Sequence, residues 1–169
     1  MSGIRIDKVR DGTQIVTFSA MVWESIDVMR ELYPEMLQEI DEYVAHHKIR
    51  KSLENFRENY CPPSGEAFIG TTDGFPVGIC LLRKEDDGGG ELNRMYVRPS
   101  ARGLGMGRML ARAVIEEARA EGLHTLRLGA LYRHTEALPL YESLGFVRHF
   151  PEGELHAGDG RVVHMKLEL

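Results

Sequence analysis

The feature that most constrains this chain is a glycine-rich run between two arginines, Arg102-Gly-Leu-Gly-Met-Gly-Arg108. The run follows a strand-like segment at residues 91–97 and opens an amphipathic helix at about residues 104–121. A helix N-terminus presents free backbone N–H groups and the positive end of the helix dipole, and glycines let a phosphate approach the main chain closely. The run therefore predicts a strand–loop–helix unit with a phosphate-binding turn.

Two better-known phosphate loops do not fit the run. A P-loop requires Gly-Lys-Ser/Thr, whereas Gly107 is followed by Arg108 and Met109. A dinucleotide-binding fingerprint requires glycine in place of Arg108 and an acidic residue at the end of the next strand, which residues 126–130 lack. A glycine-rich turn that merely begins a helix is the alternative interpretation, and three alternating glycines between arginines make it the weaker one.

Composition narrows the class of protein. A chain of 169 residues that is 43% hydrophobic and 28% charged suits one soluble domain, and we assign residues 1–169 to it. The net charge of −5 argues against nucleic acid or an anionic membrane as a partner, and no apolar stretch is long enough to span a membrane. Cys61 and Cys80 have no metal-binding or redox spacing, and the N-terminus has no apolar signal core. We therefore expect reduced thiols and a cytoplasmic location.

The seven histidines do not indicate a metal site. His46 and His47 are adjacent, so they diverge by about 100° on a helix and do not easily share one ion. The others are scattered without the spacing of metal ligands. We therefore expect no metal.

The hydrophobic pattern predicts a mixed sheet. Residues 4–9 and 14–18 have an extended pattern around a turn at Asp11-Gly12, and residues 24–60 are helical, with a break at Pro34. Further strands are expected at residues 67–71, 77–83, 91–97, 125–128, 146–150 and 162–167, with a short helix at 135–144. Early helices, an antiparallel meander and a final strand–helix–strand unit are typical of an α/β (α+β) fold.

A second motif lies at residues 134–146 and reads His134-x-x-Ala137-x-x-Leu140-Tyr141-x-x-x-Gly145-Phe146. Together with Arg102-x-x-Gly105-x-Gly107, it resembles the GNAT family of acetyl-CoA-dependent N-acetyltransferases. That family pairs an Arg/Gln-x-x-Gly-x-Gly/Ala loop with a later Asn-x-x-Ala-x-x-Leu-Tyr-x-x-x-Gly-Phe helix. The resemblance covers residues 91–146, and the chain departs from it where His134 replaces Asn and where Pro139 enters the short helix.

The resemblance implies a fold and a cofactor. The fold is a single-domain, mixed, mostly antiparallel sheet flanked by helices, with the fourth and fifth core strands splayed into a V. Acetyl-CoA is the implied co-substrate, and its pantetheine arm would pair with the backbone of Met95, Tyr96 and Val97. His134 would contact the pantetheine, or Thr135 would take over the helix cap. The pyrophosphate would bind the amides of Arg102, Gly103, Leu104, Gly105, Met106, Gly107 and Arg108.

The implied reaction is acyl transfer from the thioester to a primary amine. Alkyl amines have a pKa of about 10.4 and are mostly protonated at neutral pH, so a base or a water relay must remove a proton. Glu91, at the start of the strand that would hold the pantetheine, is our candidate base, and a solvated strand-end carboxylate is the alternative. The resemblance implies Tyr141 as the acid at the leaving thiolate, and a tyrosine that packs in the core is the alternative.

The acceptor is a small-molecule or peptide amine of unidentified structure. Trp23 and Tyr33 lie in the helices that cover the acceptor side in this family, although packing is the more common role of such residues. Glu152, Glu154 and Asp159 form an acidic loop that would attract a cationic amine if it rims the cleft, and a solvated turn is the alternative. Two rival functions stay open. The first keeps the reaction but uses a longer acyl-CoA as the donor, and the second is a non-catalytic CoA-binding sensor or partner-binding domain. The resemblance also makes a homodimer a candidate assembly.

Overall fold

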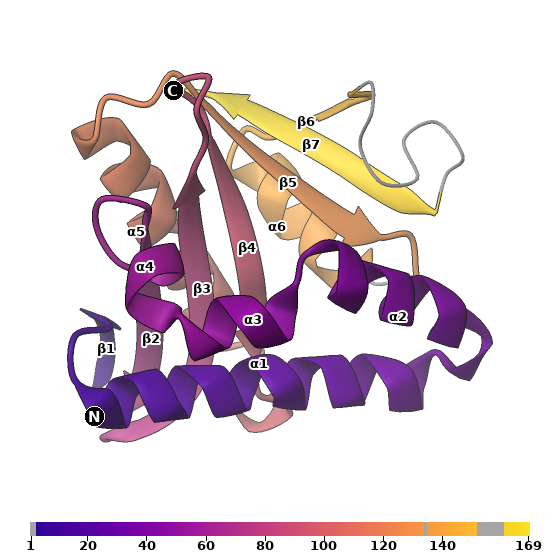
Figure 1. The fold of residues 1–169 in the computed structure, drawn as a ribbon, viewed down its shortest axis with the longest axis horizontal. Coiled ribbons are helices and arrows are strands. Elements are labelled where there is room, and N and C mark those ends of the chain that lie inside the picture. Colours follow the sequence, from indigo (N-terminus) through magenta and orange to yellow (C-terminus); the bar gives the residue numbers. More distant parts are fainter. Residues whose placement is uncertain (1–2, 134, 152–160) are drawn as a thin grey trace.

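The computed structural model describes residues 3–133, 135–151 and 161–169, and its elements are labelled in Figure 1. The strands within these residues are β1 (Ile4–Lys8), β2 (Gly65–Thr72), β3 (Phe75–Lys84), β4 (Gly90–Val97), β5 (Thr125–Leu131), β6 (Val147–His149) and β7 (Val162–Glu168). The helices are α1 (Gly12–Leu32), α2 (Leu37–His46), α3 (Ile49–Glu54), α4 (Phe56–Tyr60), α5 (Met106–Ala120) and α6 (Leu138–Ser143). The predicted fold class, a mixed sheet flanked by helices, is confirmed.

The sheet opens into a V between β4 and β5. Its strand order is β1-β2-β3-β4-β5-β7-β6, with β4 and β5 parallel and the other neighbours antiparallel. The ladder between β4 and β5 contains only the pairs Gly90 with Leu126 and Glu91 with Arg127, after which the strands diverge (Figure 1). The predicted splay is therefore present, and it leaves one edge of β4 without a partner strand in the described part of the chain.

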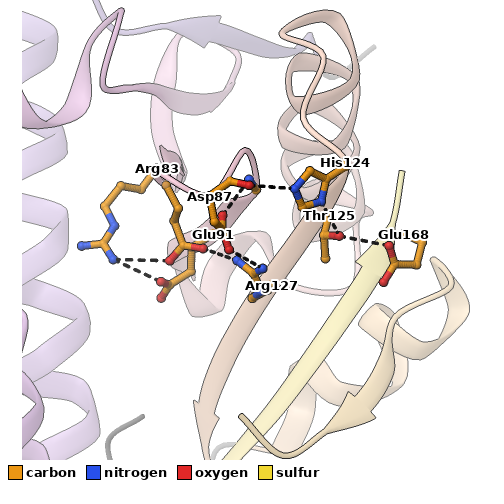
Figure 2. Close-up of polar contacts among 9 residues, drawn as sticks. Arg83, Asp87, Glu91, His124, Thr125, Arg127 and Glu168 are labelled. Carbon is orange, nitrogen blue, oxygen red and sulfur yellow. Dashed lines mark hydrogen bonds and ion pairs between the residues drawn. The ribbon is translucent and has the colours of Figure 1, made fainter. Parts of the chain in front are cut away.

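A network of charged side chains links the strands at the closed end of the V (Figure 2). Arg83 of β3 pairs with Glu91 of β4 at 3.3 Å. Arg127 of β5 pairs with Glu85 and, at 2.8 Å, with Asp87, both from the connection between β3 and β4. Because these contacts join β3, β4 and β5 where the ladder ends, they fix the point from which the strands diverge.

The expected extended segment at residues 14–18 is instead part of α1, which begins at Gly12. Asp11 and Gln14 form a capping box: the Asp11 carboxylate accepts the Gln14 N–H at 2.8 Å, and Gln14 Oε1 accepts the Asp11 N–H at 3.1 Å. The box satisfies backbone N–H groups at the helix start, and this outweighs the strand preference of the β-branched Ile15 and Val16. The Asp11-Gly12 pair is therefore a helix cap and not a turn between strands.

Both faces of the sheet carry a hydrophobic core. Side chains alternate along β3, so that Cys80 and Leu82 pack on the side of α5 and α6, while Ile79 and Leu81 pack on the side of α1 to α4. Helix α1 crosses in front of the open end of the V, and α6 lies behind it (Figure 1). The gap between β4 and β5 is thus enclosed by helices on both faces.

Cys61 and Cys80 are both buried free thiols. Burial raises the pKa of each, so both remain protonated at neutral pH. Among the helices of the described ranges, none combines the length and the apolar character needed to cross a lipid bilayer.

Candidate active site

The glycine-rich run forms the start of α5 and leaves its first amides free. Gly105 is the N-cap residue, with a φ of +85° and no side-chain cap. The first intrahelical bond runs from the Met109 N–H to the Gly105 carbonyl at 3.0 Å, so the N–H groups of residues 106–108 have no acceptor within the helix. A Cβ at Gly103 or Gly105 would meet no described atom within 4 Å. The loop therefore combines free amides with open space in front of them, as an anion site requires.

The two arginines of the run contact β4 and the region of α6. Arg102 donates from Nε to the Val97 carbonyl at 3.0 Å, and its Nη1 lies 3.6 Å from Glu136 Oε2. Arg108 donates from Nη2 to Ser143 Oγ of α6 at 2.8 Å. The two guanidinium groups thus add positive charge near the start of α5.

Met106 and Leu104 have opposite surroundings. Met106 is 2% exposed and packs against β2 and β3, where a Cβ on Gly70 or Gly78 would lie within 3.1 Å of its side chain. Leu104 is 58% exposed. Both residues are predicted to bind the cofactor. Met106 can bind it only through its main chain, because its side chain packs in the core beneath α5.

The main chain of β4 points into the V at alternate residues. The Arg98 N–H donates to the Val77 carbonyl of β3 at 2.8 Å, so the main-chain groups of Arg98 face β3. Because these groups alternate between the two edges of a strand, those of Val97 face the gap. The side chain of Tyr96 is 8% exposed and packs in the core on the α1 side. Val97 therefore offers its N–H to an extended molecule in the gap, while its carbonyl accepts from Arg102 Nε.

A β-bulge in β4 changes the direction of the strand inside the V. At the bulge, Arg94 and Met95 lie together opposite Cys80 of β3. Arg94 has a φ of +56°, in the left-handed region that non-glycine residues seldom occupy. A bulge bends its strand and re-aims a side chain. Here it helps to turn β4 away from β5 and directs Arg94 between two cavities.

Three adjoining cavities lie at the V among the described residues. The first, of about 140 Å³ and here called the V cavity, is lined by β4, β5, α1 and Tyr141 of α6. The second lies on the side of β5 and β7 and includes Glu91. The third, of about 480 Å³ and here called the basic pocket, lies between α2–α4 and β3–β4 and is bordered by Lys48, Lys51, Arg83 and Arg94. Asn93 lines all three, so they meet at this residue.

Tyr141 places its ring in the wall of the V cavity. It is 4% exposed, and its ring centroid lies 5.7 Å from that of Phe146, in an edge-to-face arrangement. Burial raises the pKa of Tyr141 above its ordinary value, so the hydroxyl stays protonated at neutral pH. A protonated hydroxyl in this wall is a hydrogen-bond donor for an anion that forms in the cavity.

Glu91 lies where the V begins to open (Figure 2). Its carboxylate pairs with Arg83 at 3.3 Å, and the Asn93 amide, oriented with its nitrogen toward Glu91, donates to Oε1 at 2.7 Å. Glu91 lines the second cavity and the basic pocket rather than the V cavity. The structure therefore brings Glu91 and Tyr141 to neighbouring cavities that meet at Asn93, and not into one cavity.

Sequence reasoning missed Tyr43, His47 and Arg94, which lie between these cavities. Arg94 Nη1 donates to the Tyr43 hydroxyl at 2.8 Å, and the guanidinium carbon lies 5.8 Å from the centroid of the Tyr43 ring. The Tyr43 and His47 rings are 4.4 Å apart, and burial, followed by the charge of Arg94, lowers the pKa of His47 to about 3. The i,i+4 spacing of the two rings and a lone cation within an apolar strand are the signals that point to these residues.

Trp23 and Tyr33 do not line these three cavities in the described part of the chain. Arg50 lies 5.2 Å from the centroid of the Trp23 ring, and Arg133 lies 5.6 Å from that of Tyr33. Contact of the two aromatic residues with substrate stays a prediction. The remaining predicted residues lie outside the described residues: His134, Glu152, Glu154 and Asp159.

Comparison with known proteins assigns the chain to a family. The model of the Acetyltransferase (GNAT) family matches residues 26–146, which include both sequence motifs and the V. The chain belongs to the GNAT family. The predicted resemblance is therefore confirmed.

Relatives and solved structures agree with this assignment. This GNAT protein is 30% identical over 148 residues to an uncharacterized N-acetyltransferase of Schizosaccharomyces pombe, covering 86% of this chain and 90% of that protein. It is 35% identical over 148 residues to N-acetylaspartate synthetase of Homo sapiens, covering 82% of this chain and 49% of the human protein. A PaiA N-acetyltransferase from Thermoplasma acidophilum, solved in complex with coenzyme A, has the same fold, with a TM-score of 0.74, 15% identity and 99% coverage of both chains.

Proposed function

We propose that this GNAT protein transfers an acetyl group from acetyl-CoA to a primary amine. The observation that carries the proposal is the V itself, whose free β4 edge runs between the amide-rich loop and the cavity that holds Tyr141. In coenzyme A a pyrophosphate is joined to a narrow pantetheine arm with amide groups, and these two features match the loop and the strand edge in that order. Its pyrophosphate would bind the amides of residues 102–108, and its arm would lie along Met95, Tyr96 and Val97.

Residues around the V would perform separate parts of acyl transfer. The amine nitrogen bonds to the carbonyl carbon, the C–S bond breaks, the thiolate leaves with its electron pair, and the nitrogen loses a proton. Tyr141, kept protonated by burial, would donate a hydrogen bond to the sulfur as its negative charge develops. Binding both reactants in the V cavity would add the advantage of proximity.

Glu91 is the proposed base for the amine proton, acting directly or through a water near Asn93. Glu91→Gln keeps the size of the side chain but removes the basic carboxylate. We expect kcat/KM for the amine to fall by about 10²-fold and its dependence on pH at the acidic limb to change. The pH profiles of wild type and variant measure both effects.

Glu121→Gln is the matched control for Glu91→Gln. Glu121 is ion-paired with Lys84, and it lines none of the three cavities at the V within the described residues. This variant should keep the wild-type profile. Superimposable profiles for Glu91→Gln and wild type would assign the proton transfer to water alone.

Release of the coenzyme A thiol tests the proposed function against its rivals. With acetyl-CoA and a panel of primary amines, the protein should release free thiol at a rate that depends on the amine, and coenzyme A should raise Tm. A non-catalytic sensor would bind coenzyme A without amine-dependent release, and an enzyme for longer acyl groups would prefer butyryl-CoA to acetyl-CoA. Folded protein that binds no coenzyme A in calorimetry would contradict the proposal.

The comparisons do not identify the acceptor. The human relative is named for the synthesis of N-acetylaspartate, and the chain spans about half of that protein's length. A small-molecule or peptide amine as acceptor, a cytoplasmic location and a homodimer stay predictions.

A further inference from the structure

The basic pocket beside the V cavity carries an excess of positive charge. Its lining includes two carboxylates, Glu58 and Glu91, against the four cations that define it. Lys48 and Lys51 are exposed and form no ion pair with any described residue. The pocket therefore attracts an anion, which the formal charge of −5 for the whole chain does not suggest.

Arg94 forms the wall that the basic pocket shares with the V cavity. Its Nη1 is bonded to the Tyr43 hydroxyl, while its Nε is buried and has no hydrogen-bond partner in the described part of the chain. A buried donor without a partner costs free energy, and a bound acceptor atom would remove that cost. A guanidinium presents its donors in a planar fork that matches a carboxylate. The unpartnered Nε of Arg94 is thus the donor in this wall that a carboxylate oxygen would satisfy.

The electrostatics of the surrounding residues agree with a carboxylate site. Arg83 is shared between Glu91 at 3.3 Å and Glu85 at 3.9 Å, so the nearby Glu91 carboxylate is already engaged. After burial, the charges of Arg94 and Arg83 contribute to the lowered pKa of His47. The His47 imidazole is therefore uncharged at neutral pH. The positive charge of the wall comes from the guanidinium and ammonium groups.

On the basis of the proposed acetyl transfer, we infer that the acceptor is an α-amino acid whose side chain carries a second carboxylate. The α-carboxylate binds Arg94, the side chain extends into the basic pocket toward Lys48 and Lys51, and the amine faces the V cavity beside Asn93. The amine and the α-carboxylate share one carbon, so a carboxylate on the common wall of the two cavities brings the nitrogen to the acetyl group. A peptide N-terminus lacks this carboxylate, and a polyamine would be repelled.

Three matched acceptors test the two carboxylates separately. L-Glutamate has both, L-glutamine replaces the distal carboxylate with a neutral amide, and 4-aminobutyrate lacks the α-carboxylate. With saturating acetyl-CoA, we expect kcat/KM to be at least about 30-fold lower for 4-aminobutyrate than for L-glutamate, because a charge in the wall is left unpaired. L-Glutamine should be about fivefold poorer, because the lysines at the pocket entrance are solvated. Putrescine provides the cationic comparison.

Substitutions assign these preferences to residues. Arg94→Gln should raise KM for L-glutamate at least about 30-fold and reduce the discrimination against 4-aminobutyrate, while KM for acetyl-CoA stays within a few-fold. Arg94→Lys, which restores the charge without the planar fork, should recover part of this loss. Combined Lys48→Ala and Lys51→Ala should remove the preference for L-glutamate over L-glutamine. Arg112→Gln, on the exposed side of α5, is the matched control and should change none of these values.

Binding without turnover gives an independent measurement. Calorimetry should detect L-glutamate binding to protein saturated with coenzyme A, and Arg94→Gln should abolish it. Equal use of L-glutamate, L-glutamine and 4-aminobutyrate, or a preference for putrescine, would overturn this inference and leave acetyl transfer intact. Folded protein that binds no coenzyme A, or that transfers acetyl to no amine, would overturn the proposed function and this inference with it.

Discussion

Gly105→Glu is expected to abolish the binding of coenzyme A to a protein that remains folded. The new carboxylate would occupy the open space in front of the loop amides and repel the pyrophosphate. A φ of +85° adds a backbone cost of about 1–2 kcal/mol for any residue with a Cβ, so Tm should fall as well. Calorimetry and thermal unfolding, each with and without coenzyme A, measure these effects separately.

Gly122→Glu is the matched control for this variant. Gly122 has a φ of +74°, and a Cβ there would also meet no described atom within 4 Å, but it follows the C-terminal end of α5. The control therefore adds the same charge and a similar backbone cost at the opposite end of the helix, and it should still bind coenzyme A. Normal binding by Gly105→Glu would contradict the phosphate-binding role of the loop.

Tyr141→Phe is expected to lower kcat by about 10²-fold while the affinity for coenzyme A changes by no more than a few-fold. The variant keeps the ring that packs on Phe146 but removes the hydroxyl that would stabilise the departing thiolate. Steady-state kinetics with a good acceptor and calorimetry with coenzyme A measure the two quantities. Tyr132→Phe, at a residue that is 41% exposed, controls for the loss of a tyrosine hydroxyl elsewhere. An unchanged kcat would show that Tyr141 packs in the core and takes no part in the reaction.

The uncapped start of α5 and the fold class could be predicted because they depend on local spacing. Alternating glycines before an amphipathic helix specify an uncapped helix start whatever packs around it, and the start of α5 has this form. The motif around Tyr141 likewise lies within one short helix. Strand boundaries followed from alternation and turn residues, and the V followed from the family resemblance.

The parts that could not be predicted depend on contacts between distant residues. Residues 14–18 have β-branched side chains, and only the reciprocal bonds between Asp11 and Gln14 show that a helix has begun. Arg94 meets Tyr43 because of a bulge in β4 and the position of α2, and neither is visible in a single sequence. The position of Glu91 on its strand predicts that it lies near the acyl group, whereas the cavity that Glu91 lines also depends on α2–α4.

The gap between β4 and β5 also bears on how this protein avoids unwanted association. An unpaired strand edge at the margin of a sheet is a template for aggregation with other chains. Here the free edge of β4 lies in the interior of the sheet, with β5 beyond it and helices α1 and α6 on its two faces. A second polypeptide strand would carry side chains toward both of these walls, whereas a narrow arm such as that of coenzyme A carries less bulk. Enclosure by α1 and α6 therefore restricts which molecules can pair with the free edge of β4.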